Sequence, residues 1–250
     1  MAVKPIIFSG PMVRALLEGR KTQTRRIVKN QHSLTVFGDT ADEVGIKWCE
    51  PVDDDGKKAP YQWASYSYEY PEEGVCPLGQ LYGSIGDLLY VRETCSAAVT
   101  HDELSAVRYE ADQCWRVIDN TRAAADLWLE MYHYRDQRGA TVPPIHMPRW
   151  ASRMTLEVTD VRVERVQDIG EEDAKAEGAE YLTTPCDHPR HTCEEIGCAG
   201  IGYRLGFADL WHSLNEKRGF GWNTNPWVVA LIFTVHKQNV DEFLKQREAA

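Results

Sequence analysis

The stretch GRKTQTRR, residues 19–26, concentrates positive charge in a chain that is acidic as a whole. The window from residue 20 to residue 29 holds five basic side chains and no acidic one: Arg20, Lys21, Arg25, Arg26 and Lys29. The full chain of 250 residues carries 38 acidic against 28 basic residues, which gives a net charge of −10. This balance argues against a surface that coats nucleic acid nonspecifically, because phosphate contacts need positive charge, but it leaves a local basic site open.

The residues around the basic stretch predict a strand, a helix and a second strand. Residues 6–8 are apolar and predict a short buried strand. Ser9 is a suitable N-cap, and Pro11 falls in the first helical turn, where a missing N–H costs nothing. Gly19 stands where a helix C-cap is expected, and residues 22–28 favour an extended conformation. The basic stretch is therefore expected to begin where the helix ends.

Alternating and amphipathic patterns predict strands and helices along the rest of the chain. Strands are expected at 88–92, 154–166 and 226–235, and helices at 170–179, 207–217 and within 237–250. Residues 30–83 predict an irregular insertion or an edge hairpin. We expect an α+β protein with a small mixed β barrel and helices at its rim. We expect a single domain over residues 1–250, with insertions at about 30–83, 101–150 and 182–205.

Two hypotheses account for the basic stretch. The helix dipole favours Lys and Arg near a helix C-terminus, so Arg20 and Lys21 could be a solvated helix end. The charges continue beyond the helix, however, and alternate with threonines. Crowding by arginines would lower the pKa of Lys21, and a neutral amine beside the hydroxyl of Thr24 can activate a weak nucleophile. Such a site also needs a carboxylate from another part of the chain.

The stretch fits the signature G-x-K-x-x-T-x-R and resembles that of ASCH domains, which have a PUA-like β-barrel fold. Other segments resemble the same family: FSGPMVRALLEGRKTQTRR at 8–26, GDLLYVRET at 86–94, VTDVRVERVQDIGEEDAKAEGA at 158–179 and FADLWHSLNEKRGFGWNTNPWVVALIF at 207–233. The resemblance covers most of the chain and is to the larger, phage-type branch of the family. Its long insertions depart from the small members and could narrow the pocket or change the substrate.

The resemblance implies a function as well as a fold. ASCH domains are regarded as RNA-binding or nucleoside-recognising modules, and some small members are amidohydrolases that remove the acetyl group from N(4)-acetylcytidine. Their reactive residues are a lysine and a threonine of the signature and a glutamate of a later helix, which match Lys21, Thr24 and a glutamate within 168–179. Glu177 fits the strand-then-helix context best, with Glu171 and Glu172 as alternatives. A glutamate on a short surface helix could equally be a solvated side chain.

Three of the seven cysteines lie close together in CDHPRHTCEEIGC, residues 186–198. No run approaches the roughly 18 apolar residues of a transmembrane helix, and no signal peptide is evident, so we expect a soluble cytoplasmic protein without a disulfide framework. The segment offers a Cys3His set of the kind that closes a structural zinc site: Cys186, His188, Cys193 and Cys198. His191 is an alternative nitrogen ligand. The segment could instead hold incidental reduced thiols or a redox pair.

The cysteine cluster leads to a metal prediction. Elemental analysis of the purified protein should show about one zinc per chain, as expected for a closed four-ligand site. Cys193→Ser should lose zinc and stability together, because a structural zinc ion is coupled to folding. Full stability without metal in both proteins would contradict the prediction.

Arginine and tryptophan side chains elsewhere are candidates for holding a base. Trp150 stands between Arg149 and Arg153, a combination that can stack on a base and add cation–π contacts. The alternative is a tryptophan that fills the core while the arginines lie in water. Arg92 could meet the substrate or simply alternate across a strand. The predicted substrate-binding set is Arg20, Arg25, Arg26, Arg92 and Trp150.

Three functions remain open from the sequence. The first is an amidohydrolase that acts on an acylated cytidine, with Lys21 as base or oxyanion partner, Thr24 as nucleophile and Glu177 as proton relay. The second is a non-catalytic RNA- or DNA-binding module in which the basic stretch grips phosphate. The third is a phage-encoded nuclease or host-interaction factor. We expect a modified nucleoside or nucleotide, or RNA, as partner, and neither a membrane nor an organic cofactor.

Overall fold

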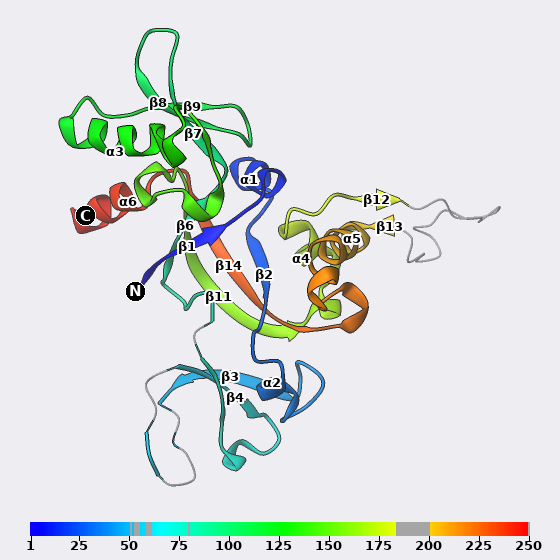
Figure 1. Ribbon diagram of the computed structural model, residues 1–250. Coiled ribbons are helices and arrows are strands. Elements are labelled where there is room, and N and C mark those ends of the chain that lie inside the picture. Colours follow the sequence, from blue (N-terminus) through cyan, green and yellow to red (C-terminus); the bar gives the residue numbers. More distant parts are fainter. Residues whose placement is uncertain (51, 53–55, 59–61, 80, 184–200, 250) are drawn as a thin grey trace, which may run out of the picture. The chain divides into compact units, whose positions relative to one another are not determined.

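The computed structural model describes residues 1–50, 52, 56–58, 62–79, 81–183 and 201–249 (Figure 1). They form two compact units, and each unit draws on separate stretches of the chain. Unit 1 comprises Met1–Gly19, Gly86–Glu157 and Thr234–Ala250, and unit 2 comprises Arg20–Ile85 and Val158–Phe233. Two long strands, β11 (Thr155–Arg165) and β14 (Trp227–His236), begin in one unit and end in the other.

Unit 1 contains two sets of paired strands and three α-helices. β1 (Val3–Ile7) pairs in parallel with β6 (Leu88–Arg92), and the start of β11 pairs with β6 in the antiparallel sense. A second sheet has the strand order β10-β7-β8-β9, with the bounds Cys95–Val99 for β7, Ser105–Tyr109 for β8, Trp115–Val117 for β9 and Thr141–Val142 for β10. The helices are α1 (Gly10–Leu17), α3 (Arg122–Tyr132) and α6 (Val240–Glu248). Trp128 and Met131 of α3 pack with the buried side chains of β7 and β8.

The end of α1 is set by a glycine. Ser9 holds the N-cap position in an extended conformation, and Pro11 lies in the first turn, both as predicted. Glu18 is the C-cap, and Gly19 follows with φ +75°, a left-handed conformation that glycine adopts without steric cost. The chain therefore turns sharply between α1 and the basic residues.

A partly buried arginine joins three segments of unit 1. The guanidinium of Arg153 contacts both carboxylate oxygens of Glu93, at 2.8 and 2.9 Å, and both oxygens of Asp112, at 2.8 and 3.0 Å. It also lies over the ring of Tyr109, 4.0 Å from the centroid. Glu93 is 1% exposed, and burial raises the pKa of its carboxyl although Arg153 opposes this. These contacts make Arg153 a structural residue of unit 1.

Unit 2 is built around an antiparallel strand pair and two packed helices. β2 (Gln23–Ile27) pairs with β14 in a register that opposes Ile27 to Val228 and Gln23 to Ile232. α4 (Glu171–Ala176) packs against α5 (Tyr203–Asn215), and β12 (Leu182–Thr183) pairs with β13 (Ile201–Gly202) (Figure 1). The core between these elements contains Ile27, Val166, Ile169, Ala174, Ala179, Phe207, Trp211 and Val228.

A side chain of α4 determines where α5 begins. The carboxylate of Glu171 accepts hydrogen bonds from the backbone N–H groups of Tyr203 and Arg204, at 2.7 and 3.2 Å. Gly202 precedes them with φ +120°, and a Cβ at this position would lie 2.5 Å from a Glu171 oxygen. α5 therefore starts at Tyr203, earlier than the predicted 207, because its first N–H groups are satisfied from another helix.

The described residues between 44 and 79 are more regular than the sequence indicated. They form a three-stranded antiparallel sheet with the order β3-β4-β5, where β3 is Val44–Cys49, β4 is Gln62–Ser67 and β5 is Cys76–Gly79. The short helix α2 (His32–Thr35) contacts β4 and β5, and the hydroxyl of Ser65 donates to the Ser33 carbonyl. Small buried residues such as Ala64 and Ser65 let these elements approach closely.

The predicted α+β class is confirmed. The described residues contain six α-helices and several sheets, and the predicted strands at 88–92, 154–166 and 226–235 are β6, β11 and β14. Within the residues that the structure describes, no sheet closes into a barrel, so this finer part of the prediction is not confirmed. None of the described helices is both long and apolar enough to cross a bilayer.

Candidate functional site

Lys21 lies inside unit 2 and is held there by backbone contacts of its own and of its neighbour Thr22. Lys21 forms an isolated antiparallel bridge with Glu177, which follows α4. The N–H of Thr22 donates to the Ala176 carbonyl at 2.8 Å, and the Thr22 carbonyl accepts from the Phe233 N–H at 3.0 Å. The side chain of Lys21 is 0% exposed. A lysine held in this way is not a solvated helix end.

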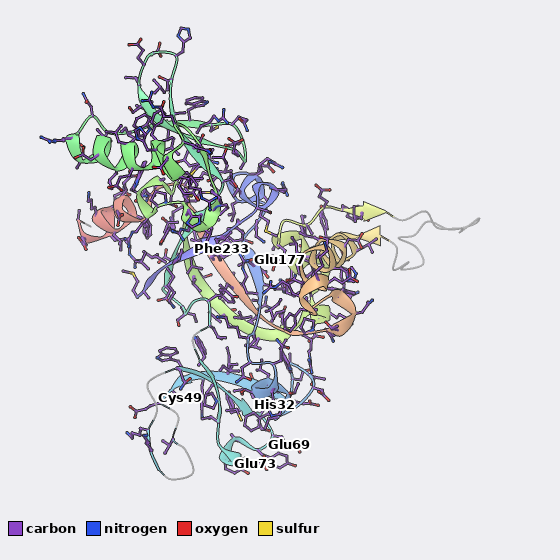
Figure 2. All side chains as sticks on the ribbon, viewed as in Figure 1. His32, Cys49, Glu69, Glu73, Glu177 and Phe233 are labelled. Atoms are coloured by element: carbon purple, nitrogen blue, oxygen red, sulfur yellow. The ribbon has the colours of Figure 1, made fainter. Side chains whose placement is uncertain are left out.

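The ammonium of Lys21 makes two contacts with a single residue. Its Nζ donates to Oε2 of Glu177 at 2.7 Å and to the backbone carbonyl of Glu177 at 2.7 Å. Glu177 is 5% exposed and is labelled in Figure 2. Burial lowers the pKa of Lys21, and Arg26 and Arg25 act in the same direction, whereas the Glu177 carboxylate opposes the shift. The site thus holds a buried amine with a lowered pKa, hydrogen-bonded to a buried carboxylate.

Arg25 occupies the same face of β2 as Lys21. Its guanidinium donates to Glu164 at 2.6 Å from Nε, to Glu177 Oε1 at 3.2 Å from Nη1 and to Asp173 at 2.9 Å from Nη2. Nη1 also reaches the side-chain oxygen of Gln23 at 3.2 Å. We call Lys21, Gln23, Arg25, Glu164, Asp173 and Glu177 the Lys21 cluster. Its cations and carboxylates alternate in space, which makes their burial tolerable.

Thr24 lies on the other face of β2. Gln23 and Arg25 both contact Asp173, at 2.8 and 2.9 Å, so their side chains share one face of the strand. Successive side chains of a strand point to opposite faces, which directs Thr24 away from this face. Thr24 is 3% exposed and is opposite Leu231 of β14. Of the three predicted catalytic residues, the structure brings together Lys21 and Glu177.

The three candidate glutamates of the α4 region have different environments. Glu171 caps the start of α5, and Glu172 is exposed. Glu177 is buried and contacts Lys21 and Arg25. The preference for Glu177 therefore agrees with the geometry, and the structure shows that this glutamate is not a solvated surface residue.

The other predicted substrate-binding residues belong to both units. Arg20 is exposed, whereas Arg26 is half-buried, and burial lowers its pKa against the opposing effect of Glu177. Arg92 and Trp150 belong to unit 1. Arg92 donates from Nε to the Met147 carbonyl at 2.7 Å, and Trp150 packs against the core formed by α3, β7 and β8. Trp150 is thus partly buried against this core.

The predicted zinc ligands Cys186, His188, Cys193 and Cys198, and the alternative His191, lie outside the described residues. Within the described part of the chain, no group of three or more His, Cys, Asp and Glu side chains is placed to hold a metal ion.

Two acidic members of the Lys21 cluster, Glu164 and Asp173, were missed in the sequence. Glu164 and Asp173 are separated from Arg25 by 139 and 148 residues, and such pairings have no local signature. Two patterns were nevertheless present. Lys21, Gln23 and Arg25 follow a two-residue period, and Asp173 and Glu177 are four residues apart, the spacing that places two helical side chains on one face.

The buried lysine leads to a prediction about pH. Because the folded pKa of Lys21 lies below its ordinary value of 10.5, the unfolded chain binds this proton more tightly than the folded chain. The contribution of Lys21 to the free energy of unfolding is thus fully present above pH 10.5 and is lost as the pH falls through the lowered pKa. The free energy of unfolding of the parent minus that of Lys21→Met should therefore rise from neutral pH towards 10.5, as measured by urea denaturation. A difference that stays flat with pH would contradict the prediction.

Comparisons with family models, curated proteins and solved structures give no significant match to this chain.

Proposed function

We propose that this protein is an ASCH-type amidohydrolase that removes an acyl group from a modified cytidine such as N(4)-acetylcytidine. The main support is the buried contact of 2.7 Å between Lys21 Nζ and Glu177 Oε2. The same lysine and glutamate were implied by the resemblance of the sequence to the family. We also propose that the protein has the PUA-like β-barrel fold of this family.

The chemistry uses the lysine and glutamate as a proton-transfer pair. An amide is cleaved when an oxygen nucleophile attacks the acyl carbon and the departing exocyclic nitrogen receives a proton. A neutral Lys21 would take the proton of the nucleophile, and Glu177 would help to pass it to the leaving nitrogen. We propose Thr24 as the nucleophile: its oxygen forms an ester with the acyl group as the C–N bond breaks, and water then hydrolyses this ester to release acetate and regenerate Thr24. Since Thr24 lies on the other face of β2, a water molecule activated by the pair is the alternative attacking group.

The charge balance of the site favours a small substrate over a long polyanion. Lys21 and Arg25 are two of the five basic residues in the window 20–29, and both contact buried carboxylates. A phosphate could reach them only by displacing these ion pairs. This supports the hydrolase over a nucleic-acid-binding module, in which the basic stretch would have to meet phosphates directly.

The test is the release of acetate and cytidine from N(4)-acetylcytidine by the purified full chain, with other N-acylcytidines as further substrates. We expect turnover of at least one of them and weak binding to unmodified RNA with a shallow salt dependence. No turnover of any acylated nucleoside, together with a salt dependence that implies about six or more neutralised phosphates, would favour the binding module.

A further inference from the structure

Arg25 is a candidate for a functional role that the ASCH signature does not assign. In G-x-K-x-x-T-x-R it occupies an x position between Thr24 and Arg26. Nevertheless its side chain is fully buried and contacts three carboxylates from three places in unit 2. The ring of Phe207, 5.9 Å from its Cζ, adds an apolar neighbour. Such an environment constrains the guanidinium to one orientation.

The two oxygens of Glu177 are divided between two cations. Oε2 accepts from Lys21 at 2.7 Å, and Oε1 accepts from Arg25 at 3.2 Å. Arg25 is itself held by Glu164 on β11 and by Asp173 on α4. The orientation of the Glu177 carboxylate thus depends on a chain of contacts that starts outside the residues implied to be catalytic.

We infer that Arg25 is a positioning residue of the proposed active site, which holds Glu177 by Oε1 so that Oε2 stays on Lys21. This inference rests on the proposed function, because it concerns the same lysine and glutamate. The alternative is that Arg25 only stabilises the packing of β2 against α4. If Arg25 is a positioning residue, a substitution that leaves the fold intact should change the pKa of Lys21 and the rate of hydrolysis. If Arg25 only stabilises packing, such a substitution should change neither.

The pKa of Lys21 depends on the charged groups that face it, and Arg25 is one of them. A change at Arg25 should therefore change the pKa of Lys21. From β2, Arg25 and Arg26 oppose its protonation, and from the end of α4 Glu177 favours it. Glu164 and Asp173 reach Lys21 only through Arg25 in the described contacts. If a shorter side chain replaces the guanidinium, its positive charge lies farther from Lys21 and Glu177 Oε1 loses a partner. Both changes favour the ammonium form, so the pKa of Lys21 should move upward.

Arg25→Lys is the main test variant. It keeps the positive charge, but a single ammonium on a flexible stem cannot reproduce the fixed fork that reaches three carboxylates. Glu164→Gln is the second variant, because it loosens Arg25 at Nε without touching Lys21 or Glu177 and changes little in volume. Arg162→Gln is the matched control. Arg162 donates to the same Asp173 oxygen at 2.9 Å, yet its side chain is 43% exposed and lies outside the Lys21 cluster.

Two measurements separate positioning from packing. The side-chain resonances of Lys21 are followed against pH by NMR in isotope-labelled full-length protein, with Lys21→Arg for assignment. The rate of acyl-cytidine hydrolysis and its pH profile are measured well below the unfolding temperature of each variant. We expect Arg25→Lys to raise the pKa of Lys21 and to lower kcat by roughly tenfold to a hundredfold. Glu164→Gln should lower kcat by less, and it should lower the pKa of Lys21, because it removes a negative charge beside Arg25 and leaves the guanidinium in place. Arg162→Gln should change neither.

The inference is overturned if Arg25→Lys and Glu164→Gln lower stability while the Lys21 titration and kcat stay at the parent values. It is also overturned if Arg162→Gln shifts both as much as Arg25→Lys. The NMR titration needs no substrate. If the parent cleaves no acylcytidine, the proposed function fails, and the titration still decides whether Arg25 controls the Lys21–Glu177 pair.

Discussion

Glu177→Gln should reduce the hydrolysis of an acylated cytidine by roughly 10²–10⁴-fold, the usual contribution of a positioned proton-transfer group. Glutamine keeps the size of the side chain and can still accept a hydrogen bond from Lys21, but it cannot take up its proton. Lys21→Met should be similarly damaging, because it removes the amine from the same contact. The measurement is the rate of acetate release from N(4)-acetylcytidine under saturating substrate.

The double variant Lys21→Met/Glu177→Gln should cost little more than either single substitution, since residues that act as a unit are strongly non-additive. Glu172→Gln is the matched control, because Glu172 is exposed and lies on α4, which Glu177 directly follows. It should keep the parent rate. A Glu177→Gln protein that is folded and fully active would exclude Glu177 as the proton relay.

Thr24→Ala belongs in the same series because it identifies the attacking oxygen. Loss of activity comparable to that of Glu177→Gln would support the threonine as nucleophile. A full rate would show that the nucleophile is misassigned and would favour water.

Arg153→Ala should destabilise the protein by about 3–5 kcal/mol, the cost of leaving one partner of a buried ion pair without compensation. The substitution removes all four contacts to Glu93 and Asp112. The buried carboxylate of Glu93 would then lack its Arg153 partner. The free energy of unfolding from urea titration measures the effect.

Arg108→Ala provides the comparison within unit 1. Arg108 also pairs with a carboxylate, that of Glu110 at 2.6 Å, but its side chain is 39% exposed. Exposed pairs are worth about 0–1 kcal/mol, so this variant should stay close to the parent. Equal effects of the two substitutions would show that burial of Glu93 does not determine the contribution of Arg153.

The sequence predicted the strands and helices with strong periodicity, and it predicted the site only in part. β6, β11 and β14 have long apolar or alternating patterns, whereas β3 to β5 contain small and polar residues whose pattern becomes clear only from their pairing. Lys21 and Glu177 were suggested by the resemblance of the sequence to ASCH domains. The contacts of Arg25 could not be found, because each joins residues at least 139 positions apart, except that with Gln23. The start of α5 was misplaced because its N-terminal cap comes from Glu171 of another helix.

The interleaved course of the chain has a consequence for the gene. The chain passes between the two units four times, after Gly19, Ile85, Glu157 and Phe233. A premature stop codon upstream of residue 234 therefore removes sequence from both units, and so does a start codon downstream of residue 20. A domain that is contiguous in sequence can be gained or lost by recombination as a single cassette. Neither unit of this protein can be exchanged in that way, so the two are expected to be inherited together.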